Sequence, residues 1–261
     1  MPTPASEPVQ ARLRRIQTAL GVDADGSLGP ETLSALEARL DISPKPSTWS
    51  LECSRRSLDE IVRFEVSSAS YYQKKLQRPT WPGVQSGVTI GIGYDLGVTS
   101  RARIRADWQL HLNDTEVDLL LVAQGVTGAN AQQLAKGLAS VVIPFDMASA
   151  VFYQSTLPLF ARQTQETFPG TESLPADAQG MLLSLVYNRG TKLTGPTRTE
   201  MAAIKELVKG SNTDLDAVAG QFESMVRLWP DSKGLRDRRL REAQLIRAAS
   251  HAYPAQEIVR V

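Results

Sequence analysis

The residue best suited to acid–base chemistry is Glu65, which lies near the end of the apolar stretch IVRFEV. An apolar setting disfavours the ionised form of a carboxyl group, so it favours a proton donor near neutral pH. A second segment, GVTIGIGYD at residues 87–95, carries Thr89 and Asp95 among several glycines. A second carboxyl group can activate water or stabilise developing positive charge. Glu65 and Asp95 therefore have the residue types that acid–base chemistry needs.

The composition of residues 79–100 predicts a short hairpin or small sheet, because glycines and β-branched residues alternate there. Alternation along a strand puts Thr89, Gly91, Gly93 and Asp95 on one face, so Thr89 and Asp95 should line the same wall. The glycines do not match a dinucleotide-binding fingerprint, because the third glycine is misplaced, and the segment lacks the lysine of a phosphate loop.

The segment GVTIGIGYD resembles the T-I-G-I-G segment of phage-type lysozymes, which follows a catalytic glutamate by a similar distance; here Thr89 lies 24 residues after Glu65. Those lysozymes carry an aspartate six residues before the threonine, where this chain has Gly83. Asp95 instead lies six residues after Thr89, an order that resembles pesticin-like bacteriocins. The resemblance implies that Glu65 protonates a glycosidic oxygen, and that Asp95, assisted by Thr89, orients water or stabilises the transition state.

Two downstream segments extend the resemblance. LVYNRG at residues 185–190 is similar to a helix end late in phage lysozymes, with Gly190 just past the helix. Asn188 either caps this helix or faces the cleft, and we place it with Tyr94 as a candidate substrate-binding residue. GLRDRRLRE at residues 234–242 resembles a helix of many endolysins. It is either a solvated, salt-bridged helix, with Arg238 and Arg239 reaching Glu242, or a contact to anionic wall polymer.

The N-terminal residues predict a small helical module. Apolar residues from Val9 to Leu20 recur at helical spacing, and Gly21 is suited to end that helix. The following D-G-x-x-G-P-x-T pattern at residues 25–32 resembles three-helix peptidoglycan-binding modules, in which it joins two helices. Pro30 would start the second helix. The resemblance implies a small three-helix bundle that binds bacterial peptidoglycan.

The predicted organisation is a peptidoglycan-binding module at 1–42, a linker at 43–56 and a lysozyme-like catalytic domain at 57–261. Prolines and serines interrupt the periodicity in the linker, and Ser57 with Glu60 forms a capping-box pattern. The fold class is mainly α (α+β), with a small β-sheet in the catalytic domain. Candidate helices are 115–124, 130–139, 144–154, 155–166, 175–189, 198–209, 213–228 and 234–249, and no strand signal is strong outside 79–100.

Composition narrows the function classes. The formal net charge of +1 gives no global basic field, which argues against nucleic-acid binding, and attraction to anionic wall polymers would have to come from a local patch. Cys53 is the one cysteine, and His111 and His251 lack metal-ligand spacing, so we expect no metal, cofactor or internal disulfide. We also expect no membrane span and a monomer.

The N-terminus lacks the apolar stretch of a secretory signal. We therefore expect a protein made in the cytoplasm that acts in the periplasm or cell wall. Delivery would depend on a holin or a secretion apparatus, and an immunity protein is a further possible partner.

The resemblance implies a muramidase that cleaves the β-1,4 bond between N-acetylmuramic acid and N-acetylglucosamine, in a phage endolysin or an antibacterial effector. Two alternatives stay open: a lytic transglycosylase, which uses one glutamate, and a non-catalytic wall-binding protein. A zinc- or nucleotide-dependent enzyme finds no support in the residue pattern.

Overall fold

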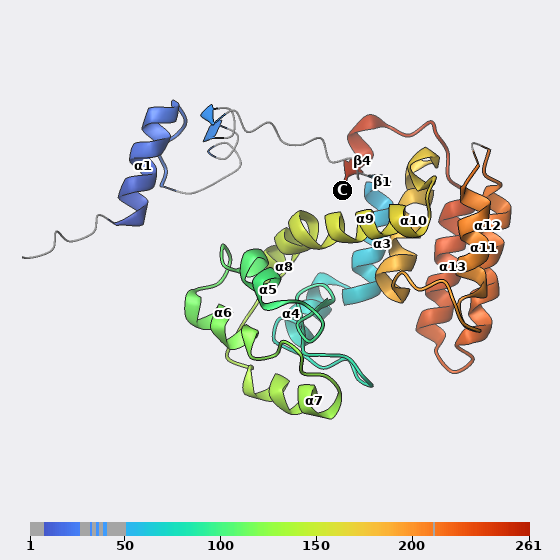
Figure 1. The fold of residues 1–261 in the computed structure, drawn as a ribbon, viewed down its shortest axis with the longest axis horizontal. Helices are drawn as coiled ribbons and strands as arrows, with labels where there is room; N and C mark the ends of the chain where they lie inside the picture. The colour runs from blue at the N-terminus through green and yellow to red at the C-terminus, as the bar shows by residue number, and fades with distance from the viewer. Residues whose placement is uncertain (1–7, 27–31, 33–34, 37–38, 41–50, 211) are drawn as a thin grey trace, which may run out of the picture. The chain divides into compact units, whose positions relative to one another are not determined.

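The computed structural model describes residues 8–26, 32, 35–36, 39–40, 51–210 and 212–261. The chain divides into two compact units, Met1–Thr48 and Trp49–Val261. The described residues are mainly α-helical, as predicted, with two small antiparallel sheets of two strands each in the second unit (Figure 1).

The first unit contains helix α1, Val9–Leu20, which has the predicted extent. Gly21 ends it in the left-handed conformation at φ 74°, which costs a glycine little. The second helix that we expected after Pro30, and with it the three-helix bundle to residue 42, falls largely outside the described residues.

A buried glutamine explains much of the D-G-x-x-G-P-x-T pattern. Nε2 of Gln17 donates to Oδ1 of Asp25 at 2.7 Å and to Oγ1 of Thr32 at 2.9 Å. Its Oε1 accepts from the backbone N–H of Gly26 at 2.8 Å. One side chain of α1 therefore holds the first two residues and the last residue of the pattern, and a buried amide satisfied in this way fixes the loop to the helix.

The predicted linker at 43–56 is wrong in its second half. Residues 43–50 lie outside the described residues, but Leu51 is fully buried and residues 52–56 belong to the second unit. Strand β1, Glu52–Ser54, pairs antiparallel with β4, Ile258–Arg260. Residues 52–54 carry no strand signal in the sequence, because three-residue strands are too short to display alternation.

Helix α3, Arg55–Val66, also begins earlier than Ser57. Its cap is Ser54, whose hydroxyl accepts from the backbone N–H of Ser57 at 3.1 Å. The predicted cap residue instead donates its own hydroxyl to the carbonyl of Ser54 at 2.7 Å. Glu60 forms ion pairs with Arg63 and Arg241, so it does not close a capping box.

The remaining helices match the predicted ones to within a few residues, and two short helices, α4 and α5, were not predicted. Their bounds are α4 Ala69–Lys75, α5 Arg101–Trp108, α6 Asp114–Leu121, α7 Gly128–Gly137, α8 Phe145–Val151, α9 Leu157–Thr167, α10 Ala176–Arg189, α11 Thr199–Val208, α12 Leu215–Ser224 and α13 Lys233–Arg247. A five-residue π-helical turn, Phe152–Thr156, joins α8 to α9, and short 3-10 turns lie at Thr171–Ser173, Met225–Leu228 and Ala255–Glu257.

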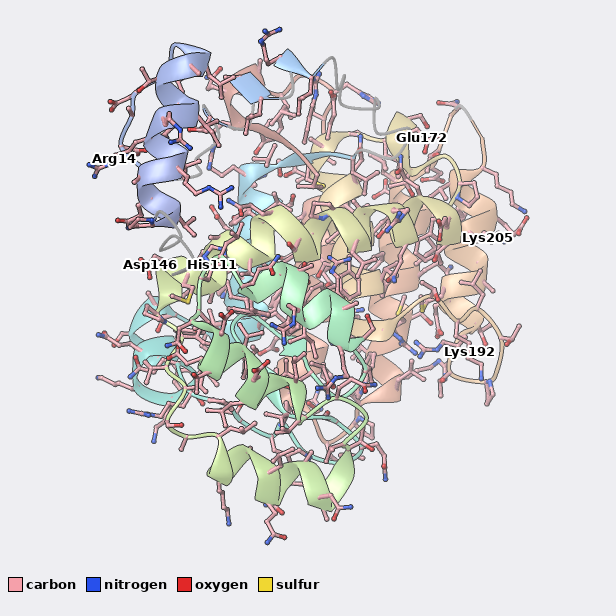
Figure 2. All side chains as sticks on the ribbon, turned by 60° about the vertical axis from the view of Figure 1, so that its left-hand side comes forward. Arg14, His111, Asp146, Glu172, Lys192 and Lys205 are labelled. Carbon is pink, nitrogen blue, oxygen red and sulfur yellow. The ribbon has the colours of Figure 1, made fainter. Side chains whose placement is uncertain are left out.

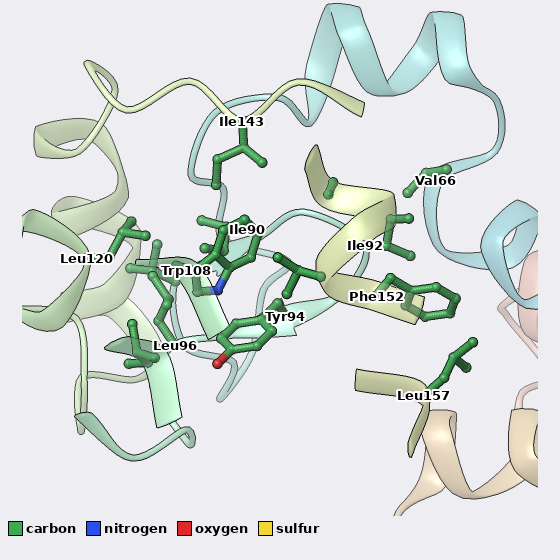
Figure 3. Packing of buried hydrophobic residues seen from close by; sticks show 14 of the residues in the cluster. Val66, Ile90, Ile92, Tyr94, Leu96, Trp108, Leu120, Ile143, Phe152 and Leu157 are labelled. Atoms are coloured by element: carbon green, nitrogen blue, oxygen red, sulfur yellow. The ribbon is translucent and has the colours of Figure 1, made fainter. Parts of the chain in front are cut away.

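Two hydrophobic clusters form the core of the second unit. The first gathers side chains from α3 to α9 and from the hairpin of β2, Thr89–Ile90, and β3, Tyr94–Asp95. Figure 3 shows Ile90, Tyr94 and Trp108 packed together within it. The second gathers side chains from α10 to α13. Helices α8 and α9 run between the two groups of helices (Figure 1).

Charged side chains cover the outside of the second unit, and Lys192 and Lys205 project from the same flank, near α10 and α11 (Figure 2). No helix within the described ranges has the length and apolar character needed to cross a membrane.

Candidate functional site

Glu65 lies in the last turn of α3, one residue before the helix ends. Its side chain is 20% exposed, and Oε1 accepts from Nη1 of Arg238 at 2.7 Å. Arg238 comes from α13, which packs in the other hydrophobic cluster. Arg238, which lies 173 residues further along the chain, therefore holds the carboxyl group of Glu65 through one of its two oxygens.

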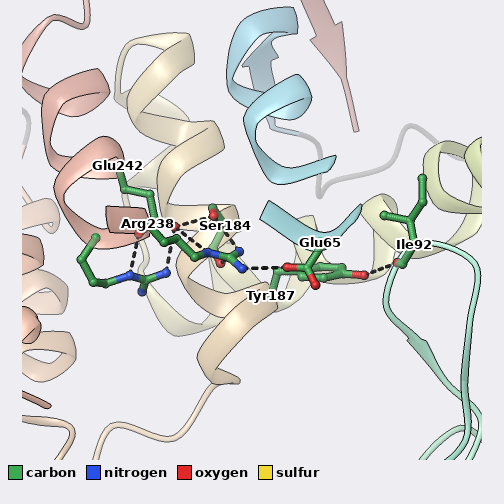
Figure 4. A network of polar contacts seen from close by, with 7 residues as sticks. Glu65, Ile92, Ser184, Tyr187, Arg238 and Glu242 are labelled. Carbon is green, nitrogen blue, oxygen red and sulfur yellow. Dashed lines mark hydrogen bonds and ion pairs between the residues drawn. The ribbon is translucent and has the colours of Figure 1, made fainter. Parts of the chain in front are cut away.

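The second oxygen of Glu65 faces the turn of the β2–β3 hairpin. A Cβ built on Gly93 would lie 3.3 Å from Oε2 of Glu65 and 2.6 Å from the hydroxyl oxygen of Tyr187. Gly93 has φ +70°, a backbone conformation that favours glycine. The lack of a side chain also lets Glu65 and Tyr187 approach the turn closely. The hydroxyl of Tyr187 donates to the carbonyl of Ile92 at 2.6 Å, which ties α10 to the same turn (Figure 4).

The hairpin has one buried face and one open face. Thr89 pairs directly with Asp95, and the N–H of Leu96 donates to the carbonyl of Val88, which makes Thr89 and Asp95 a non-hydrogen-bonded pair with close side chains. Both side chains are partly exposed, and on the other edge Thr80 pairs with Thr89. The structure thus brings Thr89 and Asp95 together by pairing across the hairpin, and not by the predicted alternation along a single strand.

Backbone amides hold the carboxylate of Asp95. Oδ2 accepts from the N–H of Gly87 at 3.0 Å, and Oδ1 accepts from the N–H of Gly97 at 2.8 Å. A Cβ on Gly87 would fall 2.2 Å from Oδ1 of Asp95, so a side chain at that position would displace the carboxylate. Asp95 therefore organises the loop on both sides of the hairpin, and each of its oxygens keeps one lone pair for water or substrate.

Tyr94 lies on the buried face, away from Thr89. Its hydroxyl donates to Oδ2 of Asp107 at 2.8 Å, and its ring meets Trp108 edge to face. Burial is the main cause that raises the pKa of Tyr94, and the hydrogen bond to Asp107 adds to it. Tyr94 pairs with Ile90 across the hairpin, and alternation within β3 separates it from its neighbour Asp95. Tyr94 also lines a cavity of about 480 Å³ together with Gly93 and Asp95. This position is the feature that favours its predicted role in substrate binding.

Asn188 is exposed in the last turn of α10, next to Tyr187. Gly190 follows the helix at φ +71°, as its predicted position after the helix end requires. The structure therefore brings Asn188 to the end of α10 that reaches the hairpin turn, but its side chain makes no hydrogen bond to another described residue.

Arg238 is the residue of the site that sequence reasoning missed. We expected Arg238, Arg239 and Glu242 to form a solvated, salt-bridged helix or to meet wall polymer. The predicted pairs are present, at 3.2 Å and 2.8 Å from Glu242, but the arginines are 4% and 0% exposed and Glu242 is 0% exposed. Apolar residues at 243, 245 and 246 bury this end of α13 in the second cluster, so these charges face inward.

A buried network fixes Arg238 in place (Figure 4). Nη2 of Arg238 donates to the hydroxyl of Ser184 at 3.0 Å, and this hydroxyl donates to Oε1 of Glu242 at 2.5 Å. Burial lowers the pKa of Arg238, but the charges of Glu242 and Glu65 outweigh burial and leave the pKa above its usual value. Arg238 therefore stays a cation that presents Nη1 to Glu65 across the working pH range.

Among the residues that the structure describes, no group of three or more His, Cys, Asp or Glu side chains is arranged to hold a metal ion. The candidate site consists of a carboxyl group, its cation and a hairpin with an open polar face. Such an arrangement is suited to moving a proton and stabilising charge.

One family model matches the chain. It is described as a domain of unknown function (DUF8812) and covers residues 64–159. No curated protein matches the chain. The matched segment contains Glu65, Thr89 and Asp95 but ends before Tyr187 and Arg238, so the similarity covers the helix end and hairpin and not the partners that close the site.

Proposed function

We propose that the chain is a muramidase that hydrolyses the β-1,4 bond between N-acetylmuramic acid and N-acetylglucosamine in bacterial peptidoglycan. The observation that carries this proposal is the carboxyl group of Glu65, held through Oε1 by buried Arg238 while Oε2 faces the Gly93 turn. A proton donor needs one oxygen fixed for orientation and the other directed at the reacting bond. The lysozyme-like resemblance of GVTIGIGYD supplies the reaction class.

In the proposed reaction, Glu65 donates its proton to the glycosidic oxygen, and the bond between that oxygen and the anomeric carbon breaks. Positive charge develops on the anomeric carbon and ring oxygen. Water then adds to the anomeric carbon, and its proton passes to a carboxylate of the site. Asp95 and Thr89, neighbours on the open hairpin face, are the proposed groups that orient this water or stabilise the positive charge.

The binding of Asp95 by two backbone amides favours a second candidate, a lytic transglycosylase. Such an enzyme needs only the glutamate, because the 6-hydroxyl of N-acetylmuramic acid attacks its own anomeric carbon and no water is consumed. Asp95 would then serve only to hold the loop. In this case the leaving oxygen takes the proton of Glu65, and the 6-hydroxyl returns one to it.

We further propose that residues 1–42 bind peptidoglycan and bring the catalytic unit to the wall. The support is the D-G-x-x-G-P-x-T resemblance together with the Gln17 contacts that hold its described residues. The setting that we propose is a phage endolysin or an antibacterial effector, made in the cytoplasm and acting in the periplasm or cell wall.

The experiment that tests the proposal is digestion of purified peptidoglycan sacs, followed by mass analysis of the released muropeptides. Reducing N-acetylmuramic acid ends are expected from a muramidase, and 1,6-anhydro ends from a transglycosylase. Binding to the sacs without release of fragments would contradict both enzyme proposals and leave a wall-binding protein.

A further inference from the structure

Positive charge is concentrated around one tryptophan, although the whole chain carries a formal net charge of only +1. Trp229 lies just after the 3-10 turn that follows α12. The guanidinium of Arg189 lies 4.9 Å from the centre of its ring, and that of Arg239 lies 5.9 Å away. Arg236 donates to the backbone carbonyl of Trp229 at 3.0 Å. Two guanidinium groups therefore lie against the indole ring, and a third holds the backbone of the same residue.

Arg189 lacks an acceptor for part of its guanidinium. Its Nη2 donates to the carbonyl of Thr197, but Nε and Nη1 are buried and have no hydrogen-bond partner among the described residues. Burial, followed by the charge of Arg198, lowers the pKa of Arg189 to about 10; Glu200 raises this pKa and Arg227 lowers it to smaller extents. An additional negative charge beside this group would offset both effects.

Glu200 compensates only part of this charge. Its Oε1 accepts from Nε of Arg227 at 2.9 Å and lies 2.8 Å from Nη2 of the same arginine. Arg227 remains 52% exposed on its outer side, whereas Glu200 is 4% exposed. The half-buried Arg198 contacts the sulfur of Met201 at 3.5 Å. One carboxylate thus stands among three guanidinium groups, two of which reach solvent.

We propose that Arg189, Arg198 and Arg227, with the indole of Trp229, form a subsite that binds a carboxylate group of the peptidoglycan stem peptide. Guanidinium groups bind carboxylates through paired N–H donors, which makes them more selective for this shape than a lysine would be. The inference rests on the proposed function, because only that function makes a stem peptide the ligand.

The position of the cluster supports this ligand. Arg189 lies two residues after Tyr187 on α10, and Tyr187 reaches the hairpin turn that faces Glu65. The side chains of these two residues leave the helix about 200° apart, but Arg239, which lies against Trp229, directly follows Arg238, which holds Glu65. A glycan held at Glu65 can therefore extend a peptide branch to Trp229. An uncharged chitin chain has no group that would use these cations.

The test measures binding rather than turnover. We would use calorimetry on the full chain in the Glu65→Gln background, with a disaccharide tetrapeptide as the probe and the same compound with amidated carboxyl groups as its neutral counterpart. The variant is Arg198→Gln, because Arg227→Gln would leave buried Glu200 without its cation. The control is Lys136→Gln, which removes one exposed charge from α7.

The expected result is an affinity for the charged probe about tenfold lower in Arg198→Gln than in the background protein, since a hydrogen bond to a charged group has this worth. The amidated probe should bind Arg198→Gln and the background protein equally, and Lys136→Gln should bind both probes as the background does. Equal affinities of Arg198→Gln and the background protein for the charged probe would overturn the subsite. The subsite would also be overturned if Arg198→Gln lost affinity only for a polymer of ribitol phosphate, measured in the same way.

The outcome is separable from the proposed function. Wild-type protein that releases muropeptides, with no effect of Arg198→Gln on binding, would remove the subsite and keep the hydrolase. Protein that binds the charged probe through Arg198 but releases nothing would keep the subsite and remove the hydrolase. A melting curve for Arg198→Gln that matches the background protein excludes unfolding as the cause of any loss.

Discussion

Glu65 and Asp95 are the two carboxylates of the candidate site, and the two regions that carry them hold them in opposite ways. Glu65 sits at a helix end and is held by one side chain, Arg238, through one oxygen. Asp95 sits on a hairpin and is held by two backbone N–H groups, one for each oxygen. The helix end leaves an oxygen directed at the turn, whereas the hairpin uses its carboxylate to fix its own loops.

The two ways of holding a carboxylate have different consequences for activity and for stability. A carboxylate that bonds to the backbone near its own strand contributes to the fold of that segment, so its replacement disturbs the loop before it disturbs any reaction. A carboxylate that bonds to a distant side chain can be replaced by an amide of the same shape with little change in the fold. The comparison therefore predicts different balances of activity loss and stability loss at the two positions.

The largest effect is expected for Glu65→Gln, because the amide cannot donate an acid proton. Turnover should fall by about 10²–10⁴-fold, while the circular dichroism spectrum stays that of the wild type. Release of reducing ends from peptidoglycan is the measurement. Glu60→Gln is the matched control, since Glu60 lies on the same helix and pairs with Arg241 at 2.8 Å. Equal losses in the two variants would show that charge on α3, not acid catalysis, is responsible.

Asp95→Asn should act mainly on stability. The amide nitrogen would face a backbone N–H of Gly87 or Gly97, which leaves one donor without an acceptor and costs about 1–3 kcal/mol. Urea denaturation measures this cost. Asp118→Asn serves as the control, because Asp118 is 64% exposed and its pair with Arg105 should be worth about 1 kcal/mol or less. An Asp95→Asn protein that is fully stable but inactive would contradict this prediction and show that Asp95 takes part in the reaction.

Gly93→Ala tests the contact between the two regions. The new Cβ would lie 2.6 Å from the hydroxyl oxygen of Tyr187, so the turn must move away from Glu65. Activity should fall, and stability should drop by on the order of 1–3 kcal/mol. Gly125→Ala is the control, since Gly125 also has positive φ, at +81°, but no atom within 4 Å of a built Cβ. Similar activities of the two alanine variants would mean that the turn need not approach Glu65.

Tyr187→Phe should give the smallest effect, a loss of about 1 kcal/mol at pH 8 from the missing hydrogen bond to Ile92. Burial, followed by the charge of Glu65, raises the pKa of Tyr187 well above its usual value. The native pKa therefore exceeds the unfolded value of about 10, so the stabilisation from Tyr187 is complete below pH 10 and declines above it. Phenylalanine does not titrate.

The stability difference between wild type and Tyr187→Phe should accordingly narrow between pH 8 and pH 11. Urea denaturation at both pH values measures it. A difference that stays constant or widens with pH would contradict the raised pKa.

Local patterns predicted much of the fold. Apolar periodicity predicted α13 nearly to its ends, because that helix packs one face against the core. Helix α10 was predicted from its continuous apolar run, and residues 176–186 are all buried. The glycines and β-branched residues of 87–95 predicted the hairpin, but the alternation expected along one strand is replaced by direct pairing of Thr89 with Asp95 across the turn. Alternation within β3 places Tyr94 on the face opposite Asp95, and a role of Tyr94 in substrate binding stays a prediction.

Other features could not be predicted, because they depend on contacts between distant segments. No local pattern reveals that Arg238 meets Glu65, 173 residues away, or that α13 turns its charges inward. Tyr187 is similar: its apolar ring predicts burial, but the acceptor for its hydroxyl lies on the hairpin turn. Strands β1 and β4 have three residues each, and only their pairing makes them strands.

The π-helical turn at Phe152–Thr156 gives the site a mechanical character. It interrupts the rod formed by α8 and α9, which connects the cluster containing α3 to the cluster containing α13. Bends in helices concentrate at such turns. Glu65 belongs to a helix of the first cluster and Arg238 to a helix of the second, so their hydrogen bond joins the same two parts of the core that this rod connects.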